Sequence, residues 1–235
     1  MSYLHHLALP PLERRRCSTP RTIAFAEALL NPLLEALSVQ VERFQRHAKQ
    51  AKKPQQRIVW LLGASDTVEG QLAQEGYFED AGAFVKGGKM QIFLVGERPL
   101  PGDWPCGREV RVHARTWEEL RPGCAAAPPD PQLAVCCNTG LGTLSSAVVS
   151  VWAPRLVDLL LRPFDQQPAV VLTCRCQAEV RGERALLAAL GAKLFMLTNK
   201  PRHVRNLYSG MAANPDIDFD DNGWLVAFHG STLGA

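Results

Sequence analysis

Residues 57–70 read RIVWLLGASDTVEG, and this stretch decides the fold class. Five consecutive apolar residues, Ile58 to Leu62, indicate a strand that is buried on both faces, as in a parallel sheet. The small and polar residues that follow, Gly63 to Asp66, predict the turn into a helix at the carboxyl end of that strand. Ligands of open α/β sheets bind at this edge. We therefore expect the stretch to form a central strand beside any ligand site.

On both sides of this stretch, short apolar segments alternate with helical patterns. Further strands are expected at residues 90–95, 110–113, 133–137, 169–173, 194–197 and 224–228. Helices are expected at about residues 67–84, 154–162 and 179–190, and loops at 97–108, 121–131 and 199–222. This alternation predicts an α/β protein with a Rossmann-like, doubly wound, mostly parallel sheet of about six to seven strands.

The residues before the first strand predict a helical arm. We expect residues 1–17 to be irregular, because Pro10–Pro11 prevents a helix through their middle. Ser18 and the residues after it form a helix start signal, and apolar residues then follow at helical spacing as far as Phe44. Asn31–Pro32 lies inside this run and should kink or restart the helix.

The charges divide the chain into two parts. Residues 1–57 hold ten Lys or Arg and four acids, and residues 58–235 hold sixteen and nineteen. We expect the first part to be a basic arm with helices that pack on the main domain, and the second to be the Rossmann-like domain, in one globular unit. Six cations without an intervening acid form a candidate contact for nucleic acid or an acidic partner: Arg43, Arg46, Lys49, Lys52, Lys53 and Arg57. The alternative is a solvated helix end, favoured because no aromatic residues are interleaved.

Composition sets the remaining limits. An apolar fraction of 46% and a charged fraction of 21% are ordinary for a soluble protein, and no apolar window is long enough to predict a membrane span. Seven cysteines in 235 residues do not suggest a disulfide framework and favour a reducing compartment. The arginine-rich first 26 residues are similar to a mitochondrial presequence, and a basic surface arm is the alternative.

Several short motifs occur in a particular order along the chain. They are RRRCSTPRTI at 14–23, GAS at 63–65, VGE at 95–97, CNTGL at 137–141, WAP at 152–154, LT at 172–173, NKP at 199–201 and NGW at 222–224. In this order they resemble the C-terminal domain of the mitochondrial splicing suppressor family. Members of that family carry a MYND-type zinc finger and act as translational activators and assembly factors. The finger needs closely spaced cysteine pairs, which this sequence lacks, so the chain is expected to correspond to the C-terminal domain alone.

The resemblance implies a function without catalysis. It suggests a docking or scaffold module, an accessory subunit or an assembly or translation factor, in a mitochondrial macromolecular complex. Other protein subunits would be its partners, RNA could bind the basic arm, and the cytoplasm is the alternative location. The family transfers no catalytic residue, and we assign no cofactor and no metal site.

The alternative function is an enzyme of the Rossmann-like methyltransferase type, intact or degenerate. It would bind a nucleotide-like cofactor above the first two strands. Gly63, Ser65 and Asp66 would supply the first turn, and Glu97 lies where such proteins place an acid after the second strand. A purely structural interpretation competes with this one, because Asp66 and Glu69 favour the start of a helix.

A second glycine turn follows a later strand. Gly140 and Gly142, with Ser145 three residues on, are similar to a dinucleotide fingerprint. That fingerprint belongs in the first strand–helix turn and needs an acid after the next strand, so a simple turn is the favoured alternative. Cys136, Cys174 and Cys176 could converge at the same edge, but free cysteines are common in cores.

Overall fold

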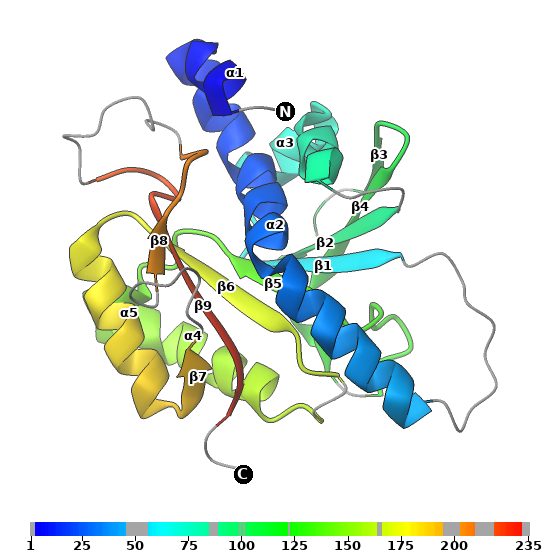
Figure 1. The fold of residues 1–235 in the computed structure, drawn as a ribbon, viewed down its shortest axis with the longest axis vertical. Coiled ribbons are helices and arrows are strands. Elements are labelled where there is room, and N and C mark those ends of the chain that lie inside the picture. The colour runs from blue at the N-terminus through cyan, green and yellow to red at the C-terminus, as the bar shows by residue number, and fades with distance from the viewer. Residues whose placement is uncertain are drawn as a thin grey trace.

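The computed structural model describes residues 3–45, 56–84, 89–98, 100, 102–121, 123–163, 166–194, 203–209 and 219–231. Nine strands in these residues form one sheet (Figure 1). They are β1 Arg57–Leu62, β2 Met90–Gly96, β3 Asp103–Cys106, β4 Val110–Thr116, β5 Leu133–Cys136, β6 Ala169–Cys174, β7 Ala192–Leu194, β8 His203–Arg205 and β9 Trp224–Ser231. Their order in the sheet is β3-β4-β2-β1-β5-β6-β9-β7, and β8 also pairs with β9.

Helical segments cover both faces of this sheet. The α-helices are α1 Tyr3–Ala8, α2 Pro11–Gln45, α3 Gln71–Gln74, α4 Ser146–Leu160 and α5 Gln177–Ala189. Shorter or tighter segments are η1 Asp66–Gly70, η2 Tyr77–Phe84, η3 Glu118–Leu120 and η4 Leu141–Thr143. Within the described ranges, no helix is both long and apolar enough to cross a membrane.

The strand order confirms the predicted fold class. Strand β1 pairs in parallel with both β2 and β5. After β1 the chain adds β2 and β4 on one side of it, and then crosses over to add β5 on its other side. This reversal creates a topological switch point at the carboxyl ends of β1 and β5. Strand β9 is antiparallel to both β6 and β7, so β7 runs parallel to β6. One reversed strand, β9, therefore lies between two strands that run parallel to each other.

The alternation of side chains along β1 explains the two cores. Val59 and Leu61 face the layer that contains α2 and η2, whereas Trp60 and Leu62 face the layer that contains α4 and α5. All four residues are at most 2% exposed. Successive side chains of a strand point to opposite faces, so an unbroken apolar run is what a sheet covered on both sides requires.

Helix α2 crosses the first of these faces (Figure 1). Its residue Ile23 is fully buried in the core beneath it. Two ion pairs fix the helix to the domain: the distance from Nε to carboxylate oxygen is 2.7 Å between Arg21 and Asp80, and 2.6 Å between Arg57 and Glu27. The arm is therefore an integral layer of the fold.

The N-terminal residues differ from the sequence prediction. Instead of an irregular lead over residues 1–17, α1 is followed by α2, which begins at Pro11. Proline is favoured at the first helical position, so Pro10–Pro11 separates two helices rather than excluding them. The expected cap, Ser18, lies inside α2, and the helix is continuous through Asn31–Pro32.

Further differences concern short elements. The helix expected at 67–84 is divided into η1, α3 and η2, with a turn at Gly76, whose φ is +81°. Strand β3 lies in the expected loop 97–108, where the sheet edge tolerates Pro105. Strand β8 lies in the expected loop 199–222, so nine described strands replace the expected six or seven. Helix α4 begins eight residues before Pro154.

Candidate functional site

The turns after β1 and β2 lie side by side at the carboxyl edge of the sheet. The backbone N–H groups of Gly63 and Ala64 both donate to the carbonyl oxygen of Val95, at 2.9 Å. A Cβ atom at Gly96 would lie 2.5 Å from the Ala64 oxygen, so only glycine allows this approach. The turns therefore present one continuous surface, on which Gly63 is exposed.

Gly63 has two structural reasons to be glycine. Its φ is +81°, and a Cβ atom there would lie 2.7 Å from Cζ2 of Trp152 in α4. The Trp152 indole is buried and makes an edge-on contact with Trp117, with 6.0 Å between ring centroids. Two indoles thus support the β1 turn from the α4 side and leave its outer surface open.

The acid predicted after β2 is at this surface. Oε1 of Glu97 forms an ion pair with the Arg155 guanidinium, which lies 4.1 Å from the centroid of the Trp117 ring. The Glu97 side chain is 65% exposed, and its Oε2 has no partner among the described residues. A carboxylate accepts several hydrogen bonds, so Glu97 can still accept from a ligand hydroxyl.

Ser65 and Glu69 close the β1 turn on the other side. The backbone N–H and the hydroxyl of Ser65 donate to Oε2 of Glu69, at 2.9 and 3.2 Å. Burial raises the pKa of Glu69, and the hydrogen bonds from Ser65 oppose this rise. Asp66 begins η1 and is exposed. Three acidic side chains therefore surround the turn.

A polar cavity of about 270 Å³ lies beside the switch point, between α2, the β1 turn and the end of β5. Two of its lining residues, Asn138 and Asn222, have positive φ angles of 46° and 56°. The Asn222 N–H donates to Oδ1 of Asn138 at 2.8 Å, and the Thr173 hydroxyl donates to Oδ1 of Asn222 at 2.7 Å. Asparagine tolerates this backbone region better than most residues, and the network holds both loops in place.

The second glycine turn lies against α5. A Cβ atom at Gly142 would lie 2.0 Å from the backbone carbonyl oxygen of Glu179. A Cβ atom at Gly182 would lie 2.0 Å from the backbone carbonyl oxygen of Gly142. Gly140 has a φ of +68° at the start of η4. These values explain both glycines by turn geometry and close packing; their contact with a cofactor stays a prediction.

A carboxylic acid is fully buried below this turn. Glu183 of α5 accepts hydrogen bonds from the Thr139 hydroxyl and the Cys174 thiol, both at 2.8 Å. Burial raises the pKa of Glu183 to about 7, although the two hydrogen bonds oppose the rise. Burial also raises the pKa of the Cys174 thiol, with the nearby Glu183 charge as a smaller cause.

Two of the three cysteines predicted at this edge are core residues, and Cys176 is half-buried. Cys136 and Cys174 are fully buried, and burial raises the pKa of both thiols. In the part of the chain that the structure describes, no cluster of His, Cys, Asp or Glu has the arrangement of a metal site.

The predicted basic cluster is only partly visible. Arg57 is 14% exposed and pairs with Glu27 in the interior, which leaves little of its guanidinium for a phosphate. The Arg43 side chain and the next four members lie outside the described residues: Arg46, Lys49, Lys52 and Lys53.

The sequence prediction missed the α4 residues that complete this site. The helix was expected to begin at Pro154. Trp152 was therefore placed just before the helix, and Arg155 in its first turn. The spacing of Trp152, Leu156 and Leu159, three buried residues four and three positions apart, was the available signal for an earlier start.

Comparisons with known proteins add little to this geometry. No family model and no curated protein matches the sequence. Among solved structures, the chain is similar to one described as "delta-N METTL16 MTase domain", with 10% identity and a TM-score of 0.39. The likeness covers 84% of this chain and 81% of that one. A TM-score this low carries no argument about function, so the fold class stands on the strand pairing.

Proposed function

We propose that this chain is a Rossmann-like domain of the methyltransferase type that binds an adenosine-containing ligand above β1 and β2. The observation that carries the proposal is the pairing of exposed Gly63 and exposed Glu97 on neighbouring turns at the switch-point edge. A glycine backbone permits close approach of a ligand, and an acid after the second strand can accept hydrogen bonds from ribose hydroxyls.

The charges of the site favour one class of adenosine-containing ligand. Asp66 and Glu69 lie in the helical segment after β1, where dinucleotide-binding proteins accommodate a pyrophosphate. Acids there repel phosphate groups, and the turn lacks the additional glycines that a pyrophosphate needs. A nucleoside without phosphates, such as an S-adenosyl compound, suits these charges better.

A thermal-shift panel tests this ligand class. S-adenosyl-L-homocysteine at one hundred times its dissociation constant should stabilise the chain by about 2.7 kcal/mol. ATP and NAD at the same concentrations should give smaller shifts, because both carry phosphates. A larger shift with NAD or ATP than with the adenosyl compound would reverse the assignment, and no shift with any of the three would remove it.

A second candidate function is a docking module in a mitochondrial complex, as the family resemblance implies. One observation favours it: Leu144, just before α4, and Val151, within α4, are 54% and 45% exposed. Exposed apolar side chains are typical of protein contacts where they join into a continuous patch. In native extracts the chain should then elute with a larger assembly, and ribonuclease treatment would show whether RNA holds it there. Elution as a free monomer would contradict docking.

A further inference from the structure

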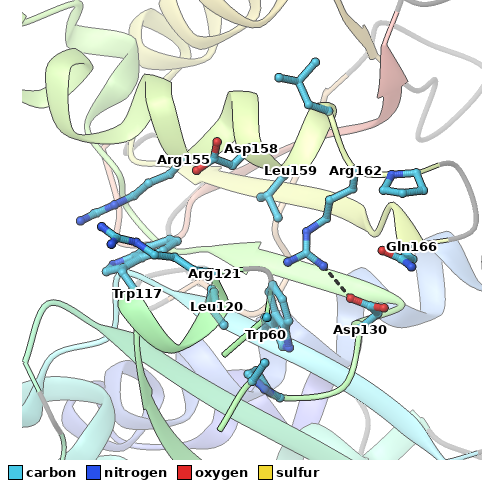
Figure 2. Close-up of a pocket in the computed structure, with 15 residues that line it drawn as sticks. Trp60, Trp117, Leu120, Arg121, Asp130, Arg155, Asp158, Leu159, Arg162 and Gln166 are labelled. Atoms are coloured by element: carbon cyan, nitrogen blue, oxygen red, sulfur yellow. Dashed lines mark hydrogen bonds and ion pairs between the residues drawn. The ribbon is translucent and has the colours of Figure 1, made fainter. Parts of the chain in front are cut away.

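A second cavity adjoins the adenosine-ligand surface and lies between α4 and residues 117–121 and 123–130 (Figure 2). We infer that this groove binds an apolar molecule that carries one anionic group. Its volume of about 440 Å³ is within the range of small-molecule sites in proteins, roughly 300–1,000 Å³. Trp117 and Arg155, which pairs with Glu97, belong to both places, so an occupant of the groove would lie next to the adenosine ligand.

The middle of the groove is apolar. Leu120 and Leu161 contribute open apolar surface, whereas Trp60, which also lines the groove, is 1% exposed and lies beneath the Arg162 guanidinium. The Trp60 indole N–H donates to the carbonyl oxygen of Pro129 at 3.2 Å, so the indole and the loop are held together. The loop side of the groove is therefore already in place, which lowers the entropic cost of binding an apolar body.

The charges at the two ends of the groove differ. At one end, Arg162 pairs with Asp130 at 2.6 Å and lies 4.7 Å from the Trp60 ring centroid, so its charge is satisfied. At the other end, Figure 2 shows Arg121 and Arg155 together with Trp117. The ion pairs of the described residues leave Arg121 without a carboxylate partner, and its side chain belongs to an exposed residue.

These two guanidinium groups define the anionic end of the occupant. Arg155 already pairs with Glu97, so Arg121 is the cation whose charge an anionic group would satisfy. Asp158 of α4 also lines the groove, and Figure 2 shows it beside Arg155, so its charge further offsets that of Arg155 and leaves Arg121 as the unpaired cation among the groove's described residues. The anion is therefore expected at the Trp117 end, next to Arg121, with the apolar body extending toward Trp60.

Fluorescence titration with 8-anilinonaphthalene-1-sulfonate tests the inference, because this probe has apolar rings and one anionic group. We expect a single saturable site on the full chain. N-phenyl-1-naphthylamine, the same ring system without the sulfonate, should bind about tenfold more weakly, since it forfeits the charge-assisted contact with Arg121. Arg121→Ala should weaken binding of the sulfonate by a similar factor and leave the neutral probe unaffected.

Two further variants complete the test. Arg181→Ala, which removes an exposed arginine of α5 away from the groove, should leave binding unchanged. Ala127→Trp, on the exposed loop, should fill the groove and abolish binding of both probes, and circular dichroism would verify that each variant is folded. Equal affinity for the two probes, unchanged binding by Arg121→Ala, or the absence of a saturable site would each overturn the inference, whatever the adenosine-ligand titration gives.

Discussion

At the residue scale, Leu144 is held in a backbone conformation that leucine rarely adopts. Its φ is 56°, and it is 54% exposed, so packing does not explain the choice. Left-handed backbone costs a leucine about 1–2 kcal/mol. Glycine avoids this cost but makes the unfolded chain more flexible. Leu144→Gly should therefore raise the free energy of unfolding by about 0.5–1 kcal/mol, measured by urea denaturation.

Leu161 offers a matched control for this change. It is 71% exposed and has a φ of −86°, which is unstrained for leucine. Leu161→Gly should lower the free energy of unfolding by about 0.5–1 kcal/mol. If both leucine variants lose stability equally, the backbone of Leu144 is not strained.

Glu183 should make stability depend on pH. Its folded pKa of about 7 exceeds the value near 4.5 expected when unfolded, so its protonated form stabilises the fold. That contribution is complete below pH 4.5 and is lost as the pH rises through 7, which amounts to about 3 kcal/mol. Glu183→Gln should remove this dependence and should be more stable than the wild type at pH 8.

Urea denaturation of both proteins at pH 5 and pH 8 measures the effect. The wild type should lose more stability than Glu183→Gln between the two pH values. Parallel losses in the two proteins would show that Glu183 does not titrate in this range.

At the same scale, two glycines have tertiary contacts that the sequence could not predict. Gly63 and Gly142 were both expected to approach a cofactor. The structure shows that Gly142 must also allow contact with Glu179, and Gly63 must allow contact with Trp152. Both partners come from later helices, so no local pattern could have revealed them.

At the element scale, α2 depends on a buried ion pair. Glu27 and Arg57 are 5% and 14% exposed, and burial raises the pKa of Glu27 despite the attraction of Arg57. Arg57→Ala would leave the Glu27 carboxylate buried and unpaired, which should cost about 3 kcal/mol or more at pH 8. The loss should be smaller at pH 5, because Glu27 can then take up a proton.

Two variants separate this role from a nucleic-acid contact. Arg111→Ala, at an exposed arginine of β4, should change stability little. Glu27→Gln combined with Arg57→Ala should recover most of the loss. An Arg57→Ala protein that is as stable as the wild type, yet binds RNA less tightly, would support the phosphate contact instead.

Elements with a continuous apolar run were predictable, whereas elements set by tertiary contacts were not. The first strand was expected at 58–62 and is found at Arg57–Leu62. Strands β3 and β8 are short and each pairs with only one neighbour in the sheet. Such strands are less covered than central ones, so they lack a continuous apolar run. Proline was the other source of error, because α2 and α4 both contain prolines that were read as helix starts or breaks.

At the scale of the whole molecule, alternating strands and helices predicted a doubly wound sheet, and the strand pairing confirms it. The antiparallel insertion of β9 between β6 and β7 could not be predicted, because strand direction is set by how the chain returns after β8. The candidate site was likewise predictable in part. The turns after β1 and β2 were predicted from the sequence, but the Trp152 indole and the Arg155 guanidinium of α4, and the Trp117 indole between them and β4, were not.

Isothermal titration calorimetry with S-adenosyl-L-homocysteine is the most direct test of ligand binding at this edge. The account predicts one site per chain. Glu97→Gln should weaken binding at least tenfold, while Glu109→Gln, at an exposed glutamate before β4, should bind like the wild type. Arg155→Ala should weaken binding less than Glu97→Gln does, because it removes the ion pair that holds Glu97 in place but frees both of its carboxylate oxygens. No measurable heat with the wild type, or equal affinity in the two glutamate variants, would contradict the account.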